Sequence, residues 1–550
     1  MVKNSLLFFG LIFLLCTARV WGQENRYVIY FTDKNNSTYS TTSPEAFLSQ
    51  KAIERRQKNQ IAVVESDLPV NETYIQQVEA LGVNVFYASK WLNAALIEAV
   101  PAKVTEIEGL SVVQKVEFVA PGGKLGSRIA ASTKMEKSHF SKRANRTNNT
   151  DLTNGQNSLL GIPHMHQLGY RGENILIGVF DSGFQEVDNL SYFGHLFTDN
   201  RIKYTFDYVN NNQNVFAVDD HGTQVLACVG AFQEDKLIGT APGAEFALCI
   251  TEDVSSEYRV EEYNWIFAAE KADSLGVDII TTSLGYNTFD DPAMDYTTAE
   301  IDGQTAIISI GAQLAADKGI LLIVSAGNLG NDATWKIITP PADVDQVITV
   351  GSITADTVKT TFSSIGPTAD GRTKPDVVTL GADVVVGYDE TSDRALGASG
   401  TSFSAPMVAG LAAGIMQAFP DKNRNEVLQM IRDSGHQANN SDTDLGFGIP
   451  SFGRARILVV GIEDKLTTAF SLFPNPVDRE FYLKLENDSR IGGVKVLIFS
   501  SLGKVVYESS RPVIPKNQQI KIDAGNLIPG LYFVQVIDGN NRINAKFLKN

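Results

Sequence analysis

The sequence predicts an α/β protein whose central domain is built on a doubly wound parallel sheet. A small α+β domain precedes this central domain and a β-sandwich follows it. Three observations lead to the prediction. Residues 156–458 alternate short apolar strands with longer helical stretches, residues 23–120 mix short strands and helices, and residues 466–550 contain recurrent short strands without helices. Because parallel strands need crossover connections, the alternation in the central segment is typical of a doubly wound sheet.

The length and charge of the chain narrow its class. It has 550 residues, of which 43% are hydrophobic and 20% are charged. This length suits several globular domains, because single domains seldom exceed about 250–300 residues. The formal net charge is −16, which argues against nucleic acid or an anionic membrane as the main partner, because both would repel the protein. We expect a monomer.

Residues 1–22 have the pattern of a signal peptide. Lys3 supplies the positive start, residues 6–15 form an apolar core, and Gly22 ends a plausible cleavage site. The apolar core is too short to cross a bilayer. Cys16 raises the alternative of a lipoprotein, although Leu15 is bulky where a lipidation motif has a small residue. The N-terminus therefore predicts export.

Residues 23–120 predict a small sheet with helices on one face. Strand character covers residues 27–31, 83–87, 92–100 and 112–119, and helical character covers residues 44–56, 75–81 and 101–107. Residues 121–155 are rich in Ser, Lys, Arg, Asn and Thr and have no apolar period, which indicates an exposed linker. Proteolytic nicking concentrates in such segments, so we expect a maturation cut there.

The central domain, residues 156–458, has polar residues at the ends of its predicted strands. The strands cover residues 175–180, 245–250, 278–282, 321–324 and 347–350, and the helices include residues 260–275, 300–318 and 404–418. Open α/β sheets bind ligands beyond the carboxyl ends of their strands. We therefore expect the functional site at that edge.

Ser402 is the candidate nucleophile. It lies in the segment Gly400–Pro406, before an apolar helical run, and the N-terminus of a helix favours negative charge. A serine hydroxyl is a weak nucleophile that needs a base. His221, at the start of another apolar helical run, is the candidate base, and Asp181, at the end of a strand, is the candidate orienting acid. Asn328 follows a strand and can donate to an oxyanion.

Each of these residues alone has a purely structural explanation. Asp181 and Ser402 could cap helices, His221 could be a surface or internally bonded histidine, and Asn328 could be a turn residue with positive φ. Their occurrence together, in the order Asp, His, Ser that subtilisin uses, favours the catalytic interpretation.

The chain resembles the subtilisin-like serine peptidases, the subtilase family. The resemblance covers roughly residues 155–458 and rests on Asp181-Ser182-Gly183, His221-Gly222-Thr223, Ser325-Ala326-Gly327-Asn328 and Gly400-Thr401-Ser402-Phe403-Ser404-Ala405-Pro406. It implies hydrolysis of polypeptides through an acyl-enzyme by the triad Asp181, His221 and Ser402, with Asn328 in the oxyanion hole. It also implies a substrate channel lined by Ser283, Leu284, Gly285, Ser325, Ala326 and Gly327.

The flanking segments resemble known companions of this family. In element order and position, residues 23–120 resemble the inhibitory propeptide domain, which implies a precursor that its own propeptide holds inactive. Residues 466–550, with Phe473-Pro474-Asn475-Pro476, Gly530-Leu531-Tyr532-Phe533 and a lysine-flanked terminal strand, resemble the C-terminal sorting domain of the type IX secretion system. That system belongs to Bacteroidetes, so the resemblance implies export by its machinery to the medium or the cell surface.

The expected chemistry needs no cofactor, because the triad and the oxyanion donors carry it. The segment 231–236 is shorter than the calcium loop of many relatives, so that site is not transferred to this chain. The pairs Asp219-Asp220 and Asp290-Asp291 could bind structural calcium through oxygen ligands, with solvated acidic loops as the alternative. We therefore assign no metal ligand.

Two further alternatives stay open in the sequence. Cys228 and Cys249 lie in apolar surroundings, so we expect buried thiols, with a single bridge between them as the alternative. In place of an enzyme, the same scaffold could serve as a non-catalytic surface binding module. The four-part candidate site favours the enzyme.

Overall fold

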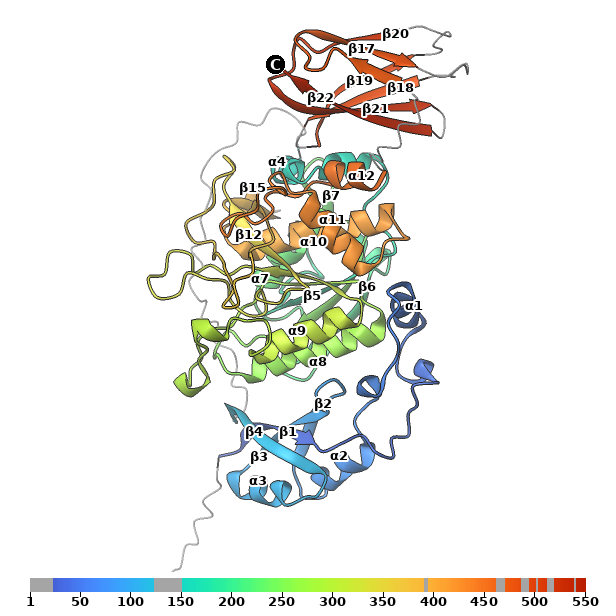
Figure 1. Cartoon of the computed structure of the whole chain (residues 1–550). Coiled ribbons are helices and arrows are strands. Elements are labelled where there is room, and N and C mark those ends of the chain that lie inside the picture. The colour runs from blue at the N-terminus through green and yellow to red at the C-terminus, as the bar shows by residue number, and fades with distance from the viewer. Residues whose placement is uncertain are drawn as a thin grey trace, which may run out of the picture.

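The computed structural model describes residues 23–122, 151–389, 394–460, 470–485, 494–500, 503–511, 519–538 and 541–550. The predicted signal peptide and most of the predicted linker lie outside these residues. Three bodies follow one another along the molecule (Figure 1). An N-terminal α+β domain and a C-terminal β-sandwich contact opposite ends of a central α/β domain, and the predicted fold class is confirmed.

The N-terminal domain is a four-stranded antiparallel sheet in the order β2-β3-β1-β4. Its strands are β1 (Asn25–Phe31), β2 (Asn84–Ser89), β3 (Ala94–Ala99) and β4 (Val113–Pro121). Helices α2 (Glu72–Glu79) and α3 (Pro101–Glu108) cover the sheet face that points away from the central domain (Figure 1).

The helix expected over residues 44–56 is divided in two. A 3-10 turn, Pro44–Ala46, is followed by helix α1 (Gln50–Lys58), which starts where the Ser49 hydroxyl accepts the Ala52 amide at 3.1 Å. Helix α1 leaves the small sheet and lies beside the central domain (Figure 1). The amide of Ser49 donates to the carbonyl of Ser274 there, at 2.9 Å.

The central sheet has seven parallel strands in the order β13-β12-β11-β10-β5-β9-β6. They are β5 (Leu176–Asp181), β6 (Ile202–Asp207), β9 (Glu245–Ile250), β10 (Ile279–Thr282), β11 (Leu321–Ser325), β12 (Ile348–Ile353) and β13 (Val377–Leu380). The sequence predicted five of them. It missed the two edge strands, which are β6, largely half-buried and without a continuous apolar run, and β13.

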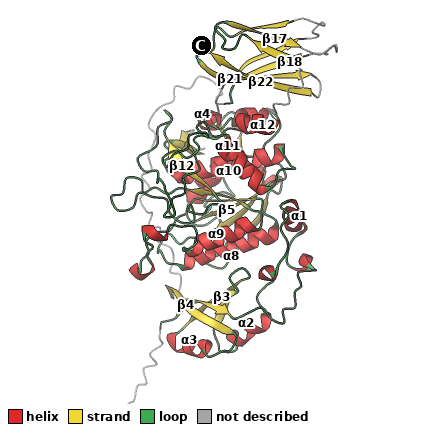
Figure 2. Ribbon diagram, viewed as in Figure 1, coloured by secondary structure: helices red, strands yellow, loops and turns green. Residues whose placement is uncertain are grey.

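Helices cover both faces of the sheet (Figure 2). On one face, α7 (His221–Gly230) and α10 (Thr401–Ala418) pack into one large apolar core, and on the other α8 (Val260–Leu275) and α9 (Ile307–Asp317) pack into a second. The helix predicted over residues 300–318 starts later, at Ile307. The Asp302 carboxylate accepts the amides of Gln304 and Thr305 at 2.8 Å, and Gly303 has a φ of +78°, so a turn occupies the expected first helical residues.

Smaller elements complete the central domain. They are α4 (Asn154–Leu159), α5 (Ile162–Gln167), α6 (Gly194–Thr198), α11 (Arg424–Asp433), α12 (Phe452–Val460) and the hairpins β7 (Phe232–Gln233) with β8 (Leu237–Ile238) and β14 (Val384–Asp389) with β15 (Arg394–Ala398). Cys228 and Cys249 are buried free thiols, as expected. Among the described residues, we find no helix with the length and apolar character needed to cross a membrane.

The C-terminal body consists of two antiparallel sheets. One contains β16 (Phe470–Phe473), β17 (Glu480–Leu485) and β20 (Gln519–Asp523), and the other contains β18 (Val494–Ser500), β19 (Val505–Arg511), β21 (Gly530–Asp538) and β22 (Asn541–Lys549). The rings of Phe481 and Phe547 meet in its core at 4.7 Å. It approaches the central domain at the ring pair His164–Phe499, 5.7 Å apart, and where Gly453 lies against Gly503 without room for a side chain.

Candidate active site

Asp181 and His221, far apart in sequence, meet at the carboxyl edge of the central sheet. Asp181 is the last residue of β5 and is fully buried, and His221 is the first residue of α7. The Nδ1 of His221 lies 2.6 Å from Oδ1 of Asp181. The Ser182 amide also donates to this carboxylate oxygen, at 2.9 Å. The carboxylate is thus fixed from its own strand and orients the imidazole.

A glycine makes this approach of helix and strand feasible. A Cβ at Gly222 would lie 2.3 Å from the carbonyl oxygen of Gly183 and 3.0 Å from Cβ of Asp181. Any side chain would therefore push the start of α7 away from the end of β5. This contact gives a physical reason for the His-Gly-Thr sequence at the start of the helix.

The surrounding charges favour the protonated form of His221. Burial works against protonation, but the charge and hydrogen bond of Asp181 outweigh it, with smaller contributions from Glu252 and Asp219, and they raise the pKa of His221 to about 9. The side chain keeps 17% of its surface exposed. Because the side chain is partly exposed, the imidazole can exchange protons with solvent and with a substrate. The neighbouring carboxylates favour its protonated form.

Ser402 lies in the first turn of α10 and is 5% exposed. The ring of the next residue, Phe403, lies 5.8 Å from the His221 ring. In this structure the Ser402 hydroxyl donates to the carbonyl of Ser283 at 3.5 Å, and the Ser283 hydroxyl donates to the carbonyl of Ser402 at 2.8 Å. Within the described part of the chain, no hydrogen bond joins Ser402 to His221.

Asn328 is exposed. Its side-chain amide is oriented by Thr401, the residue before Ser402. Its Oδ1 accepts the backbone amide of Thr401 at 2.9 Å and the Thr401 hydroxyl at 3.0 Å. Because the oxygen is occupied, the Nδ2 group is the end left for other partners. This arrangement places a donor near the residue that precedes the candidate nucleophile, which suits an oxyanion.

The six residues expected to line the channel lie at two neighbouring strand ends. Ser283, Leu284 and Gly285 follow β10, and Ser325, Ala326 and Gly327 end and follow β11, the strand paired with β10. Gly285 has no room for a side chain, because a Cβ would lie 2.2 Å from the Thr339 hydroxyl. Gly327 has a φ of +100°, a backbone conformation that favours glycine.

Sequence reasoning missed an acidic cluster beside this site. Glu252, Glu257 and Glu261 bring one carboxylate oxygen each within 4.8 Å of one another. The expected acidic pairs Asp219-Asp220 and Asp290-Asp291 do not belong to this cluster. The only signal in the sequence is the four-residue spacing of Glu257 and Glu261 ahead of a helical run, which alone does not distinguish a site from a solvated face.

The N-terminal domain packs against α8, one of the two helices that cover one face of the central sheet. Asp273, a fully buried residue of α8, receives Arg55 at 2.5 Å, Arg56 at 2.9 Å and Lys90 at 2.8 Å. Burial alone would raise the pKa of Asp273, but these three cations outweigh it and lower the pKa to about 2. In the reverse direction, Lys318 after α9 pairs with the buried Asp67 of the N-terminal domain at 2.8 Å. Each domain therefore contributes both basic and acidic side chains to this contact.

Fold and site together define a class: a parallel α/β sheet that carries an aspartate, a histidine and a helix-borne serine at its carboxyl edge. Residues 172–448 match the subtilase family, and the chain belongs to that family. Residues 26–137 match the peptidase S8 propeptide domain of Bacteroidota, and residues 471–550 match the secretion system C-terminal sorting domain. The chain therefore combines a propeptide domain, a subtilase domain and a sorting domain.

Similar proteins carry the same family name at low identity. The chain is 26% identical over 289 residues to subtilisin NAT from Bacillus subtilis subsp. natto, and 27% identical over 373 residues to subtilisin-like protease SBT6.1 from Arabidopsis thaliana. These matches span 52% and 62% of this chain but 66% and 32% of those proteins, so the chain spans less than two thirds of either.

The fold also has a counterpart among solved structures. The epidermin leader peptide processing serine protease from Staphylococcus aureus superimposes with a TM-score of 0.54 at 17% identity. The superposition covers 80% of this chain and 99% of that one. At this identity the similarity supports the fold.

Proposed function

We propose that the chain is a secreted serine endopeptidase, made as an inactive precursor, that hydrolyses peptide bonds through an acyl-enzyme. The observation that carries the proposal is the 2.6 Å contact between the buried Asp181 and His221 at the carboxyl edge of the sheet, beside the helix that begins with Thr401-Ser402. Membership of the subtilase family supports it.

In this proposal the Ser402 hydroxyl turns from the Ser283 carbonyl toward His221 and attacks the carbonyl carbon of the peptide. His221 takes the hydroxyl proton and later gives it to the leaving amine. Asp181 holds the imidazole in the required tautomer and stabilises its charged form. Asn328 Nδ2 and the Ser402 backbone amide donate to the oxyanion. Water then hydrolyses the acyl-enzyme, with His221 again as the base.

The same proposal assigns roles to the flanking domains. The N-terminal domain acts as an intramolecular inhibitor until a cut in residues 121–155 releases it, and its match to a propeptide domain supports this role. The C-terminal sandwich directs export by the type IX machinery, and its match to a sorting domain supports that role. The substrates are polypeptides, and the triad requires no metal or other cofactor.

Labelling with phenylmethylsulfonyl fluoride tests the catalytic proposal. We expect processed protein to carry one sulfonyl adduct on Ser402, located by peptide mass mapping, and the Ser402→Ala variant to carry none. Asp181→Asn should fold but label far more slowly, because it no longer stabilises the protonated His221. Absence of an adduct on processed, folded protein would refute the proposal and favour a binding module on the same scaffold.

Intact mass and N-terminal sequencing of exported protein test the processing proposal. We expect a new N-terminus within residues 121–155 and loss of the C-terminal sandwich. Retention of residues 466–550 would contradict removal of the sorting domain and would leave the catalytic proposal unaffected.

A further inference from the structure

The loop after β5 and the loop before α7 are joined by a series of hydrogen bonds. The Phe184 amide donates to the Val215 carbonyl at 3.0 Å, and the Gln185 amide donates to the Asp219 carbonyl at 2.9 Å. The Thr223 hydroxyl, in the first turn of α7, donates to the Gln185 carbonyl at 2.7 Å. The first loop begins at the candidate catalytic acid and the second ends at the candidate base. These bonds therefore hold the two candidate catalytic residues in place relative to each other.

The Asp219 side chain lies where these two loops meet, and one of its oxygens serves both. Its Oδ1 accepts the Ser182 hydroxyl at 2.9 Å and the His221 backbone amide at 3.0 Å. Ser182 directly follows Asp181, and its own amide donates to Oδ1 of Asp181 at 2.9 Å. Asp219 thus contacts the residue beside the acid and the backbone of the base, through hydrogen bonds that its charge strengthens.

The backbone at Asp219 suits this arrangement. Its φ is +43°, in the left-handed region that few residues other than glycine adopt. Aspartate is one of the exceptions, because its short side chain can form hydrogen bonds nearby. The partner loop carries a glycine at the point of closest approach, since a Cβ at Gly183 would lie 1.9 Å from the Val218 carbonyl oxygen. The two loops therefore meet closely enough for one carboxylate to contact both.

The Ser182 hydroxyl has two carboxylates within reach but only one proton to donate. Its oxygen lies 2.9 Å from Oδ1 of Asp219 and 3.3 Å from Oδ1 of Asp181, so Asp219 is the better acceptor. The other oxygen of Asp181, Oδ2, is buried and has no hydrogen-bond partner in the described structure. With the hydroxyl directed to Asp219, the negative charge of Asp181 is left to the imidazole and to the Ser182 amide.

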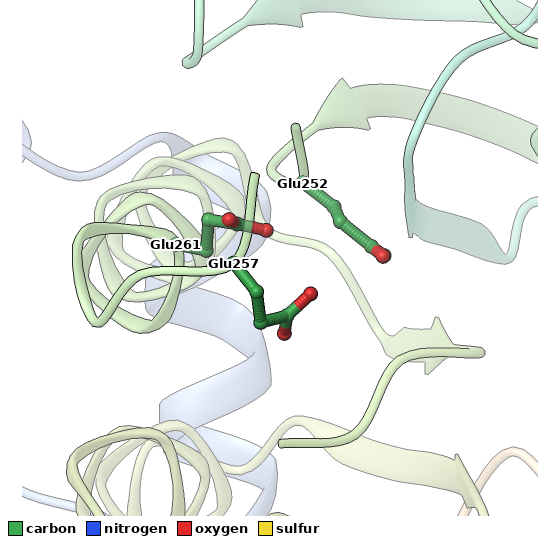
Figure 3. Close-up of side chains that lie close together, drawn as sticks. All are labelled: Glu252, Glu257 and Glu261. Carbon is green, nitrogen blue, oxygen red and sulfur yellow. The ribbon is translucent and has the colours of Figure 1, made fainter. Parts of the chain in front are cut away.

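Asp219 is also one of the acidic groups that face the imidazole. Burial lowers the pKa of His221, whereas the charge and hydrogen bond of Asp181 and the charges of Glu252 and Asp219 raise it. These carboxylates come from β5, from the segment after β9 and from the loop before α7. Figure 3 shows that Glu252 reaches toward the other two carboxylates of the acidic cluster. Asp219 differs from Glu252 because it combines its charge with a hydrogen bond to the first residue of α7.

Resting on the proposed peptidase function, we propose that Asp219 is a positioning residue for the pair Asp181 and His221. It bonds the first residue of α7 to the end of β5, and it draws the Ser182 hydroxyl away from the Asp181 carboxylate. Its negative charge also favours the protonated imidazole. Removing that charge therefore makes His221 a weaker base, which loses its proton at lower pH.

Asp219→Asn tests the charge, because it keeps the size of the side chain and one oxygen that can accept a hydrogen bond. The pH profile of kcat/KM is measured in processed enzyme with an internally quenched peptide. We expect the rising limb to move to lower pH by about 0.5–1 unit. This is less than the shift of about 1–3 units that a close, buried charge causes, because His221 is partly exposed. On the plateau, kcat should fall only a few-fold.

Asp188→Asn is the matched control, because Asp188 is an exposed carboxylate in the same loop after β5. It makes the same chemical change and should leave the rising limb where the wild-type enzyme has it. A limb that Asp219→Asn leaves in place, or that Asp188→Asn moves equally far, would overturn the proposal.

Asp219→Ala removes both hydrogen bonds and tests the positioning. We expect a similar shift of the limb and, in addition, a plateau kcat about 10- to 100-fold below that of Asp219→Asn, because small displacements of catalytic groups cost about that much. Ser182→Ala should cost less in the Asp219→Ala background than alone, since the hydrogen bond between the two residues is already absent. If the two losses simply multiply, Asp219 does not act through Ser182 and the proposal is wrong.

Two measurements separate this proposal from the proposed peptidase function. Sulfonyl labelling of Ser402 in processed wild-type protein reports the peptidase. An NMR titration of the His221 imidazole in the Ser402→Ala precursor reports the effect of Asp219 without turnover, and the His221 resonance is identified by its absence in His221→Asn. We expect Asp219→Asn to lower the midpoint of this titration. A lowered midpoint in a chain that does not label would refute the peptidase alone, and a labelled enzyme with an unmoved midpoint would overturn the role of Asp219 alone.

Discussion

Replacing Asp273 with asparagine removes the charge on which three cations of the propeptide domain converge. Arg55, Arg56 and Lys90 each approach this buried carboxylate within 3 Å. The substitution keeps the size of the side chain and one oxygen that can accept a hydrogen bond. It therefore tests the charge at this contact with little change in packing.

The expected loss follows from the burial of the pair. Removing one partner of a buried ion pair costs about 3–5 kcal/mol, because it leaves an uncompensated charge. The low end applies here, because the asparagine oxygen still accepts one donor, Arg56 retains Asp67 at 3.1 Å, and Arg55 retains the Val277 carbonyl at 2.6 Å. About 3 kcal/mol corresponds to a shift of about 150-fold in the equilibrium between docked and undocked propeptide.

Hydrogen exchange measures this equilibrium in the intact chain. The background is Ser402→Ala, which lacks the proposed nucleophile and so cannot cut its own linker, and intact mass verifies that the propeptide is still attached. The reporters are the Ser49 amide, which bonds to Ser274 across the contact, and the amides of α1. A helix as short as α1 is marginal in water, so its amides exchange when it undocks. Their protection should fall by about 150-fold in Asp273→Asn.

Asp188→Asn serves as the control, because Asp188 is exposed on the central domain and is not among the contacts of the propeptide domain. It makes the same chemical change and should leave protection unaltered. If the Ser49 and α1 amides of Asp273→Asn exchanged at the rate seen in the control, the charge at Asp273 would not hold the propeptide, and apolar contacts would have to carry the docking.

Three further outcomes follow from the site and the core. Initial rates on both sides of pH 9 should show kcat/KM rising through about 9, because the base must be unprotonated and the pKa of His221 is raised to about 9; a plateau reached near neutral pH would contradict this. Asn328→Ala should lower kcat by about 10²–10³-fold, the loss known for an oxyanion donor of subtilisin, with KM little changed. Steady-state kinetics on processed, unlabelled enzyme test this, and an unchanged kcat would exclude the role. Asp376→Asn should lower the apparent melting temperature by about 6–12 °C, because it leaves the buried Lys374 and the neighbouring Arg432 without their shared carboxylate; calorimetry with an unshifted midpoint would refute it.

The central fold was predictable because its strands are continuous apolar runs. Strands β5, β9 and β11 are buried along nearly their whole length, so they stand out in the sequence. Strand β6 does not stand out in the sequence. It lies at the edge of the sheet, where most of its residues are only half-buried, so it has no continuous apolar run. The predicted start of α9 was wrong, because the Asp302 carboxylate accepts backbone amides in a turn where the helix was expected to begin.

The site was predictable only as far as local motifs reach. The sequence placed Asp181 and His221 each at the end of an element, and the structure joins them. Their catalytic roles, and those of Ser402 and Asn328, stay predictions. The hydrogen bond of Ser402 to Ser283 depends on a rotamer that no sequence pattern encodes.

The acidic cluster could not be predicted from the sequence, because its residues come together only in the fold. Glu252, Glu257 and Glu261 become neighbours only where the chain turns between β9 and α8. In α8, Asp273 and Glu270 are charged residues that a sequence would place at the surface, yet both are buried. The propeptide domain covers them, so their burial depends on a distant part of the chain.

The propeptide domain and the β-sandwich contact opposite ends of the subtilase domain (Figure 1). One contact is the ionic interface at α8 and the other is a small contact at Gly453 and His164. They share no residue, so removal of either domain leaves the other interface whole. If both domains are removed as proposed, the two cuts can occur in either order, and a molecule trimmed at one end only should be a stable species that can be isolated.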